Sequence, residues 1–137
     1  MADYSELCRL ADEARKSSYC IYSDYAVGAA LLTKDGHIYQ GCNIENASYP
    51  AGICAERTAF SKAISEGERH FEAIAIAGGR VGEKADAAYP CGVCRQFMNE
   101  FTERDFRILV LQKDGSYSEH TMDELLPFSF GPKSLNK

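Results

Sequence analysis

The sequence lacks a long apolar run and lacks an excess of positive charge. Its longest apolar stretch, residues 26–32, contains a glycine and is far shorter than the ~20 residues that a membrane-spanning helix needs. With 15 basic and 20 acidic residues, the formal net charge is −5, which would repel the phosphate backbone of a nucleic acid. We therefore expect neither a membrane nor a nucleic acid as a partner.

Internal repeats, low-complexity tracts and proline- or serine-rich linkers are also missing. Residues 1–137 are therefore predicted to form a single domain. A chain of this size can bury roughly two thirds of the surface that it exposes when unfolded, so its core needs no disulfides. The first six residues are acidic and polar, unlike a secretory signal, which favours a cytoplasmic location.

Helical and strand-like patterns alternate along the chain. Apolar residues at helical spacing predict helices over residues 4–16 and 54–66, and a third helix that begins at Pro90. Short apolar runs between turn residues predict strands over residues 26–33, 37–43, 71–77, 107–112 and 116–120, the third of them stopped by Gly78 and Gly79. A capping-box pattern at residues 121–124 predicts a short helix ending before Pro127, and residues 128–137 are predicted to be irregular.

This order of elements indicates an α/β fold. Strands that are linked by helices favour parallel pairing, whereas the first and the last pairs of strands are close enough to form hairpins. We therefore predict a three-layer α-β-α sandwich around a five-stranded mixed sheet.

Six cysteines are many for a cytoplasmic chain, and they fall into two groups. Without a secretory signal, disulfides are not expected. Cys8 lies on an amphipathic helix, Cys20 follows that helix and Cys42 ends a strand, so we interpret these three as small buried residues.

Cys54, Cys91 and Cys94 lie where predicted helices begin, and the exposed N–H groups of a helix start stabilise thiolates. The spacing Cys91-x-x-Cys94 places two sulfurs about one helical turn apart, so that they can bind one ion, and Cys54 is the natural third ligand. The three histidines lie away from this motif. Structural zinc sites close with four protein ligands, so three ligands with an open position indicate catalytic zinc. A structural zinc module or a redox pair stays an alternative for the C-x-x-C alone.

Glu56 stands two residues after Cys54, in the first turn of the same predicted helix. A carboxylate at this position can simply complement the helix dipole. Beside a metal ion with an open position it can instead accept and deliver a proton of bound water. The pairing of Cys-Ala-Glu with Pro-Cys-Gly-Val-Cys is typical of zinc-dependent deaminases, in which the glutamate is not a metal ligand.

Beyond this signature, nearly the whole chain resembles the short, homotetrameric cytidine deaminases of pyrimidine salvage. The resemblance is carried, in order, by YSDYAVGAAL (residues 22–31), GCNIENASY (41–49), CAERTA (54–59), PCGVCRQ (90–96), and ELLP (124–127) with FGP (130–132). It implies the cytidine deaminase-like fold, one Zn²⁺ per subunit and a homotetramer in which subunits share their pockets.

The resemblance also implies a role for each matching residue. Cys54, Cys91 and Cys94 hold the zinc ion, and Glu56 shuttles protons. For the substrate, a pyrimidine nucleoside, the implied contacts are as follows: Asn43 and Glu45 bind the ribose 3′-hydroxyl, Tyr49 walls the sugar side, Tyr25 lies near the base, the Ala55 backbone meets the pyrimidine edge, and Phe130 packs on the base in a neighbouring subunit's pocket. Without the resemblance, Asn43 and Glu45 are an ordinary polar turn after a strand.

The implied reaction is the zinc-dependent hydrolysis of cytidine and 2′-deoxycytidine to uridine and 2′-deoxyuridine with release of ammonia. Zinc-bound hydroxide attacks C4 of the base, and Glu56 transfers the proton to N3 and then assists the departure of ammonia. Three thiolates on one Zn²⁺ leave a net charge of −1, which opposes the formation of hydroxide. Arg57 is the expected source of compensating charge at the sulfurs, and Arg95 is a second candidate; a solvated arginine is the alternative for both.

Three positions depart from the family pattern. Tyr25 stands where phenylalanine is common and adds a hydroxyl that needs a partner. Ile21 replaces a common proline, and Tyr89 replaces a small residue before Pro90.

Other amino-pyrimidines are competing substrates: free cytosine, cytosine in a polynucleotide, or a nucleoside antibiotic. Asn43 and Glu45 favour a nucleoside, because a free base has no ribose to hold. The charge of Glu45 disfavours a nearby phosphate.

Overall fold

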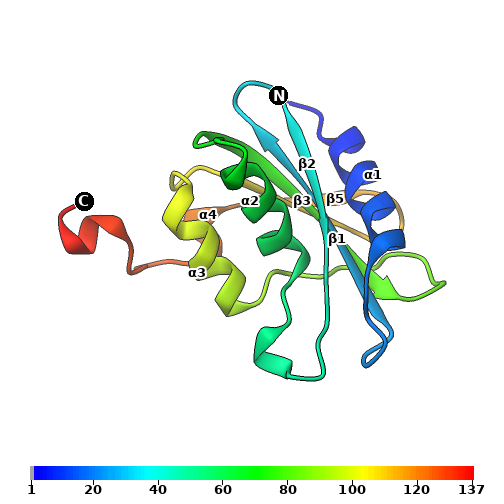
Figure 1. The fold of residues 1–137 in the computed structure, drawn as a ribbon. Coiled ribbons are helices and arrows are strands. Elements are labelled where there is room, and N and C mark those ends of the chain that lie inside the picture. Colours follow the sequence, from blue (N-terminus) through cyan, green and yellow to red (C-terminus); the bar gives the residue numbers. More distant parts are fainter. Residues whose placement is uncertain (1) are drawn as a thin grey trace.

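A twisted sheet of five strands forms the centre of the computed structural model, which describes residues 2–137 (Figure 1). The strands lie in the order β2-β1-β3-β4-β5. Their bounds are β1 (Tyr25–Thr33), β2 (Ile38–Cys42), β3 (Phe71–Arg80), β4 (Arg107–Leu111) and β5 (Tyr117–Thr121).

The sheet is mixed, as the sequence predicts. Strands β1 and β2 form an antiparallel hairpin, and so do β4 and β5. Strand β3 pairs antiparallel with β1 on one side and parallel with β4 on the other. The parallel pair is the one whose two strands are joined through a helix, because a chain needs a long crossover to return in the same direction.

Helices cover both faces of the sheet. Helix α1 (Ser5–Ala14) lies on one face, and α2 (Ala55–Ser65) and α3 (Gly92–Phe101) lie on the other (Figure 1). A short helix, α4 (Met122–Leu125), follows β5, and 3₁₀ turns occur at η1 (Arg15–Ser17), η2 (Tyr49–Ala51) and η3 (Pro132–Leu135). The three-layer sandwich is therefore confirmed. Within residues 2–137, no helix is long and apolar enough to cross a membrane.

The alternation of side chains along β3 divides the core in two. Ile74 and Ile76 point toward α2 and α3, where they pack with Phe60. Ala73, Ala75 and Ala77 point toward α1, where Cys8 is buried among them as expected. Small side chains on the α1 face let that helix lie close to the sheet.

Two glycines set the distance between helices and sheet. A Cβ atom at Gly28 in β1 would lie 1.9 Å from the carbonyl oxygen of Ala11 in α1. A Cβ atom at Gly41 in β2 would lie 2.5 Å from the backbone nitrogen of Ala59 in α2. Both helices therefore contact the sheet through their backbone, and Gly41 near the end of β2 lies against the backbone of Ala55 and Ala59 in α2.

Some predicted boundaries are wrong. Strand β3 does not stop at Gly78 but continues to Arg80, because the longer β1 pairs with it as far as Tyr25. The first helix ends at Ala14, and η1 occupies the next turn. The tail, expected to be irregular, contains η3, whereas the capping box at Thr121 is present as predicted.

Candidate active site

Three cysteine sulfurs meet between the beginnings of α2 and α3. Cys54 is the N-cap residue of α2, Cys91 is the N-cap residue of α3, and Cys94 lies in the first turn of α3. Their Sγ atoms all lie within 4.8 Å of one another. Sulfurs that share a tetrahedral zinc ion at 2.3 Å stand about 3.8 Å apart, so small side-chain shifts complete the site. The three-sulfur cluster predicted from the sequence is confirmed, and its geometry is consistent with one zinc ion.

The surroundings of the cluster favour negative charge on sulfur. The Cys54 Sγ accepts hydrogen bonds from the Cys94 thiol and from Arg57 Nη2, the latter at 3.6 Å, and they lower the pKa of Cys54 to about 5. The same hydrogen bond retains the proton of Cys94 and raises its pKa, and burial adds to this effect. A cation that binds to this cluster must therefore displace the proton of Cys94.

Glu56 is buried beside these sulfurs, with 4% of its surface exposed. It lies in the first turn of α2, directly after Ala55, which is fully buried. Burial raises the pKa of Glu56 to about 7, and the neighbouring Cys54 thiolate adds to the shift. A carboxyl group that titrates near neutral pH can both accept and release a proton.

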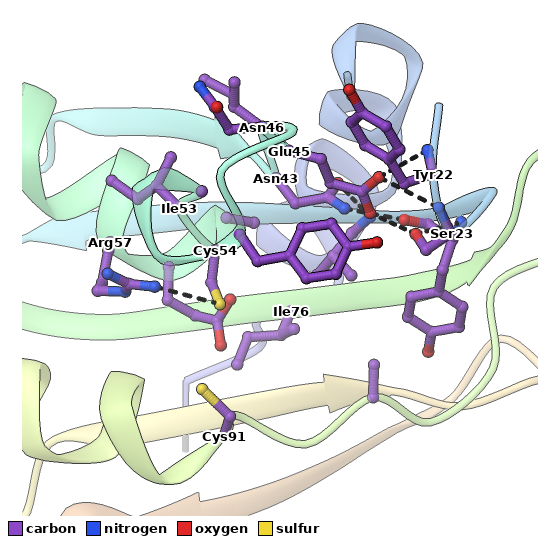
Figure 2. A pocket seen from close by; sticks show the side chains of 18 of the residues that line it. Tyr22, Ser23, Asn43, Glu45, Asn46, Ile53, Cys54, Arg57, Ile76 and Cys91 are labelled. Atoms are coloured by element: carbon purple, nitrogen blue, oxygen red, sulfur yellow. Dashed lines mark hydrogen bonds between the residues drawn. The ribbon is translucent and has the colours of Figure 1, made fainter. Parts of the chain in front are cut away.

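A cavity of about 820 Å³ opens beside Glu56 and the cysteine cluster (Figure 2). Its walls come from β1, from the loop between β2 and α2, from the first turn of α2 and from the segment before α3. It brings together most of the residues singled out in the sequence: Tyr25, Asn43, Glu45, Tyr49, Cys54, Ala55, Glu56, Arg57 and Cys91. Figure 2 shows the sulfurs of Cys54 and Cys91 at one end of this group and Glu45 at the other.

Asn43 and Glu45 are fixed by hydrogen bonds at the far end of the cavity. The Asn43 Oδ1 accepts from the Val27 N–H at 2.9 Å, and its Nδ2 donates to the Tyr25 carbonyl at 2.8 Å. Glu45 Oε1 accepts from the N–H groups of Tyr22 at 3.0 Å and Ser23 at 3.2 Å.

The Ser23 hydroxyl also donates a hydrogen bond to Glu45, at Oε2. This bond is the largest cause of the lowered pKa of Glu45, and the backbone N–H groups act in the same direction. Glu45 is therefore an ionised and oriented acceptor at the cavity rim.

Several lining residues were not singled out from the sequence. Ser23 lies within a motif that carries the resemblance, but only the fold shows that it contacts Glu45. Ile76 lies on the face of β3 that points toward α2, which the alternation along the strand indicates. Ala87 and Ala88 come from the irregular segment before α3, for which the sequence gives no such signal.

The two arginines considered for charge balance have different surroundings. Arg57 donates to a sulfur, and its buried Nε has no hydrogen-bond partner within the described residues. Arg95 donates instead to the backbone carbonyls of Pro90 at 2.7 Å and Leu125 at 2.9 Å. Arg95 therefore connects the segment before α3 to α4, and Arg57 is the arginine at the metal-binding cluster.

Two of the three positions that depart from the family pattern line the cavity. Tyr25 and Tyr89 both line the cavity. The Tyr25 hydroxyl lies against Gly78, where an added Cβ atom would come within 2.9 Å of it. The Tyr89 ring meets His120 edge-on, with ring centroids 5.6 Å apart. Ile21 is 60% exposed.

Comparison with known proteins places this arrangement in a family. A family model described as "Cytidine and deoxycytidylate deaminase zinc-binding region" matches residues 1–110. The chain belongs to the cytidine deaminase family. Cytidine deaminase of Halalkalibacterium halodurans is 44% identical over 134 residues, which cover 98% of each chain. Cytidine deaminase of Sporosarcina psychrophila is 42% identical over 134 residues, 98% of this chain and 96% of the relative.

Solved structures of cytidine deaminases have the same fold. The crystal structure of cytidine deaminase from Burkholderia pseudomallei superimposes with a TM-score of 0.86 at 38% identity, covering 94% of this chain and 100% of the other. Cytidine deaminase from Mycobacterium tuberculosis gives a TM-score of 0.80 at 34% identity, covering 96% and 99%. The zinc-binding region of the family therefore coincides with the part of the chain that holds all three clustered cysteines.

Proposed function

We propose that this protein hydrolyses cytidine and 2′-deoxycytidine to uridine and 2′-deoxyuridine, with release of ammonia, in pyrimidine salvage. One observation carries the proposal: a buried glutamate adjoins a three-sulfur metal site at one end of a cavity whose other end presents a fixed carboxylate. The first end suits hydrolytic chemistry on the base, and the second suits a sugar hydroxyl. Family membership supports the same substrate class.

Cys54, Cys91 and Cys94 would hold one Zn²⁺ per subunit. Three thiolates suit zinc, and a set of three protein ligands leaves a position open. When bound, zinc acts as a Lewis acid that makes a water molecule acidic enough to be a nucleophile at neutral pH. Arg57, which donates to the Cys54 sulfur, withdraws negative charge from a site whose net charge would be −1.

Glu56 carries the protons of the reaction. It accepts a proton from the attacking water and delivers it to N3 of the base, so that the ring can accept electrons as the C4–O bond forms. The other proton of that water then passes through Glu56 to the amino group, and the C4–N bond breaks to release ammonia. Water and cytidine thus give uridine and ammonia, with every proton accounted for. Burial of Glu56 excludes bulk water from these transfers.

The opposite end of the cavity selects a nucleoside. Glu45 accepts the ribose 3′-hydroxyl, Asn43 supports that contact, and Tyr49 covers the sugar. Tyr25 lies beside the base, and the Ala55 backbone meets its edge. Because Glu45 is ionised, it disfavours a substrate with phosphate on that side of the sugar. A polynucleotide and a free base therefore fit less well than a nucleoside.

The assembly is part of the same proposal. Residues 1–137 act as one domain, and four copies form a cytoplasmic homotetramer with shared pockets. Phe130 supports this arrangement, because it is 61% exposed and does not line the cavity of its own chain. Its ring is available to pack on the base in a neighbouring subunit's pocket.

A substrate panel tests the proposal. Purified protein is incubated with cytidine, 2′-deoxycytidine, cytidine monophosphate and cytosine, with and without a zinc chelator. The ultraviolet change from cytosine to uracil and the released ammonia report turnover. We expect turnover of the two nucleosides that the chelator abolishes. An inactive protein with stoichiometric zinc would contradict the proposal and favour a structural zinc module.

A further inference from the structure

The C-terminal tail has a fixed backbone but exposed apolar side chains. Phe128, Phe130 and Leu135 are all more than half exposed, and Phe128 is fully so. Phe128 also has a backbone φ of +54°, a left-handed conformation that is unfavourable for a large side chain. Such a conformation persists only where the surrounding contacts determine it. Because the apolar side chains of the tail are exposed, contacts with other parts of the chain must hold its conformation.

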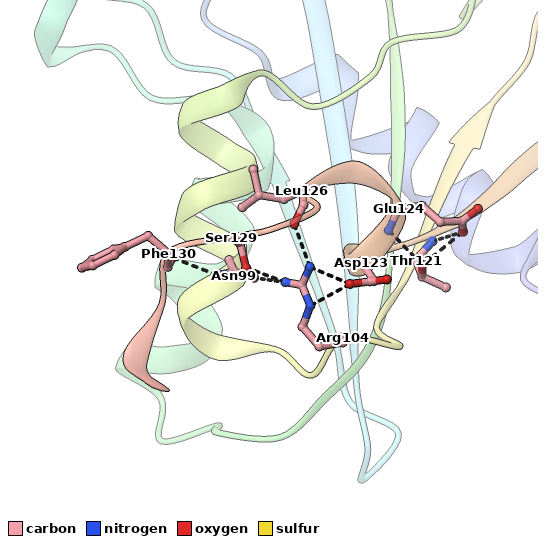
Figure 3. A network of polar contacts seen from close by, with 8 residues as sticks. All are labelled: Asn99, Arg104, Thr121, Asp123, Glu124, Leu126, Ser129 and Phe130. Carbon is pink, nitrogen blue, oxygen red and sulfur yellow. Dashed lines mark hydrogen bonds and ion pairs between the residues drawn. The ribbon is translucent and has the colours of Figure 1, made fainter. Parts of the chain in front are cut away.

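Arg104 makes the first set of contacts that hold the tail (Figure 3). Its Nη2 donates to the Leu126 carbonyl at 2.7 Å, and its Nη1 donates to the Ser129 hydroxyl at 2.9 Å. Asp123 pairs with the same guanidinium group at 3.0 Å. The Arg104 side chain thus contacts residues on both sides of Phe128, and Figure 3 shows it at the centre of the polar contacts.

Side chains of helix α3 make the second set of contacts that hold the tail. Asn99 is 7% exposed, accepts from Arg104 at its Oδ1 and donates from its Nδ2 to the Phe130 carbonyl at 3.1 Å. Gln96, one turn earlier, donates to the same carbonyl at 2.8 Å. Two side-chain amides therefore hold one carbonyl oxygen. A Cβ atom at Gly131 would lie 3.0 Å from Asn99 Nδ2, so the tail lies directly against this helix.

We propose that Gln96, Asn99 and Arg104, together the tail clamp, are positioning residues that fix residues 126–130 so that Phe130 reaches a neighbouring copy's pocket. The inference rests on the proposed function, because it assumes that Phe130 packs on the base there. The tail clamp contacts no substrate. It orders the tail before two chains meet, so that forming the shared pocket does not require the ordering of a flexible segment.

The direct test changes both amides to carboxylates. The variant Gln96→Glu/Asn99→Asp keeps the size of both side chains but removes both donors to the Phe130 carbonyl. We expect KM for cytidine to rise about three- to tenfold, as for the loss of one aromatic contact, with kcat little changed. Zinc content should stay at one per chain, which shows that Cys91 and Cys94 at the start of α3 are undisturbed. If the double variant folds poorly, Gln96→Glu alone takes its place in the test, because Gln96 is an exposed residue.

Gln112→Glu is the matched control. Gln112 donates from its side-chain amide to the Val110 carbonyl at 3.0 Å, in the β4–β5 hairpin and away from the tail. We expect it to leave KM unchanged. A second comparison introduces Gln96→Glu/Asn99→Asp into Phe130→Ala. If the tail clamp acts through Phe130, KM should not rise further in that background; additive effects would contradict the inference.

Mixed assemblies distinguish action on a neighbour from action within one chain. Chains with Glu56→Ala and a native tail are co-expressed with chains that carry Gln96→Glu/Asn99→Asp, and assemblies containing both are isolated through two different tags. Every active pocket then belongs to a clamp variant but can receive a native tail. We expect KM to return toward the native value. A KM equal to that of the clamp variant alone, or a native KM in that variant, would overturn the inference. Failure of the native protein to deaminate cytidine would instead reject the proposed function.

Discussion

We expect Ser23→Ala to weaken the binding of cytidine while sparing the chemical step. Glu45 accepts three hydrogen bonds, from the Tyr22 N–H, the Ser23 N–H and the Ser23 hydroxyl. The substitution removes the third, so that the carboxylate is held through Oε1 alone and Oε2 is oriented less firmly. Because the site lies at an exposed rim, the loss is that of one partly screened charge-assisted bond, and KM for cytidine should rise about two- to tenfold with kcat unchanged.

The assay compares cytidine with 3′-deoxycytidine. If Ser23 acts by orienting Glu45 toward the 3′-hydroxyl, the substitution should raise KM for cytidine and leave KM for the 3′-deoxy compound nearly unchanged. Ser116→Ala is the control, because the Ser116 hydroxyl donates to the Asp114 carboxylate at 2.6 Å in a turn away from the cavity. An equal rise for both compounds, or no rise for either, would show that Ser23 does not act by orienting Glu45 toward the 3′-hydroxyl.

The same variant has a predictable dependence on pH. The Ser23 hydroxyl is the main reason that the pKa of Glu45 lies below its ordinary value of 4.5. The benefit of the charged carboxylate is present above the pKa of the folded protein and is lost as the pH falls through it. Ser23→Ala raises that pKa, so KM for cytidine should begin to rise at a higher pH in the variant than in the native protein.

Three further predictions concern the metal site and the core. Cys94→Ala should reduce bound zinc far below one per chain by metal analysis. Arg57→Gln should raise the pKa of the Cys54 thiol, so that protons displace zinc at a higher pH in a metal-release titration. Gly28→Ala should lower the free energy of unfolding, measured by urea denaturation, by about 2 kcal/mol or more, because the added Cβ atom would overlap the Ala11 carbonyl. Gly92→Ala is the control and should leave the free energy of unfolding nearly unchanged, because its added Cβ atom meets nothing within 4 Å.

Local patterns explain what could be predicted from the sequence. Cys54, Cys91 and Cys94 each stand at a helix start, and a helix start fixes both the position of a residue and the electrostatics around it. Two such starts at the same edge of a sheet bring the sulfurs together. The short apolar runs between turn residues similarly predict the five strands. These features depend on few residues that are close in the sequence.

The features that could not be predicted depend on contacts between segments that are far apart in the sequence. Strand β3 reaches Arg80 because it pairs with β1 as far as Tyr25, and the two glycines at positions 78 and 79 do not end it. Arg95 is adjacent to a metal ligand, yet its guanidinium group contacts the carbonyl of Leu125, which lies 30 positions away. The order of the tail similarly depends on Arg104 and Asn99. None of these pairings has a periodic signal that a single sequence displays.

The most direct test of the central claim measures zinc and turnover on the same sample of Glu56→Ala. In the proposed reaction, Cys54, Cys91 and Cys94 bind the metal ion, and Glu56 takes part in every proton transfer. We therefore predict about one zinc ion per chain and a fall in kcat for cytidine of about a thousandfold or more, the effect of losing a group that serves several proton steps. Turnover close to the native rate by a zinc-loaded Glu56→Ala protein would contradict the account.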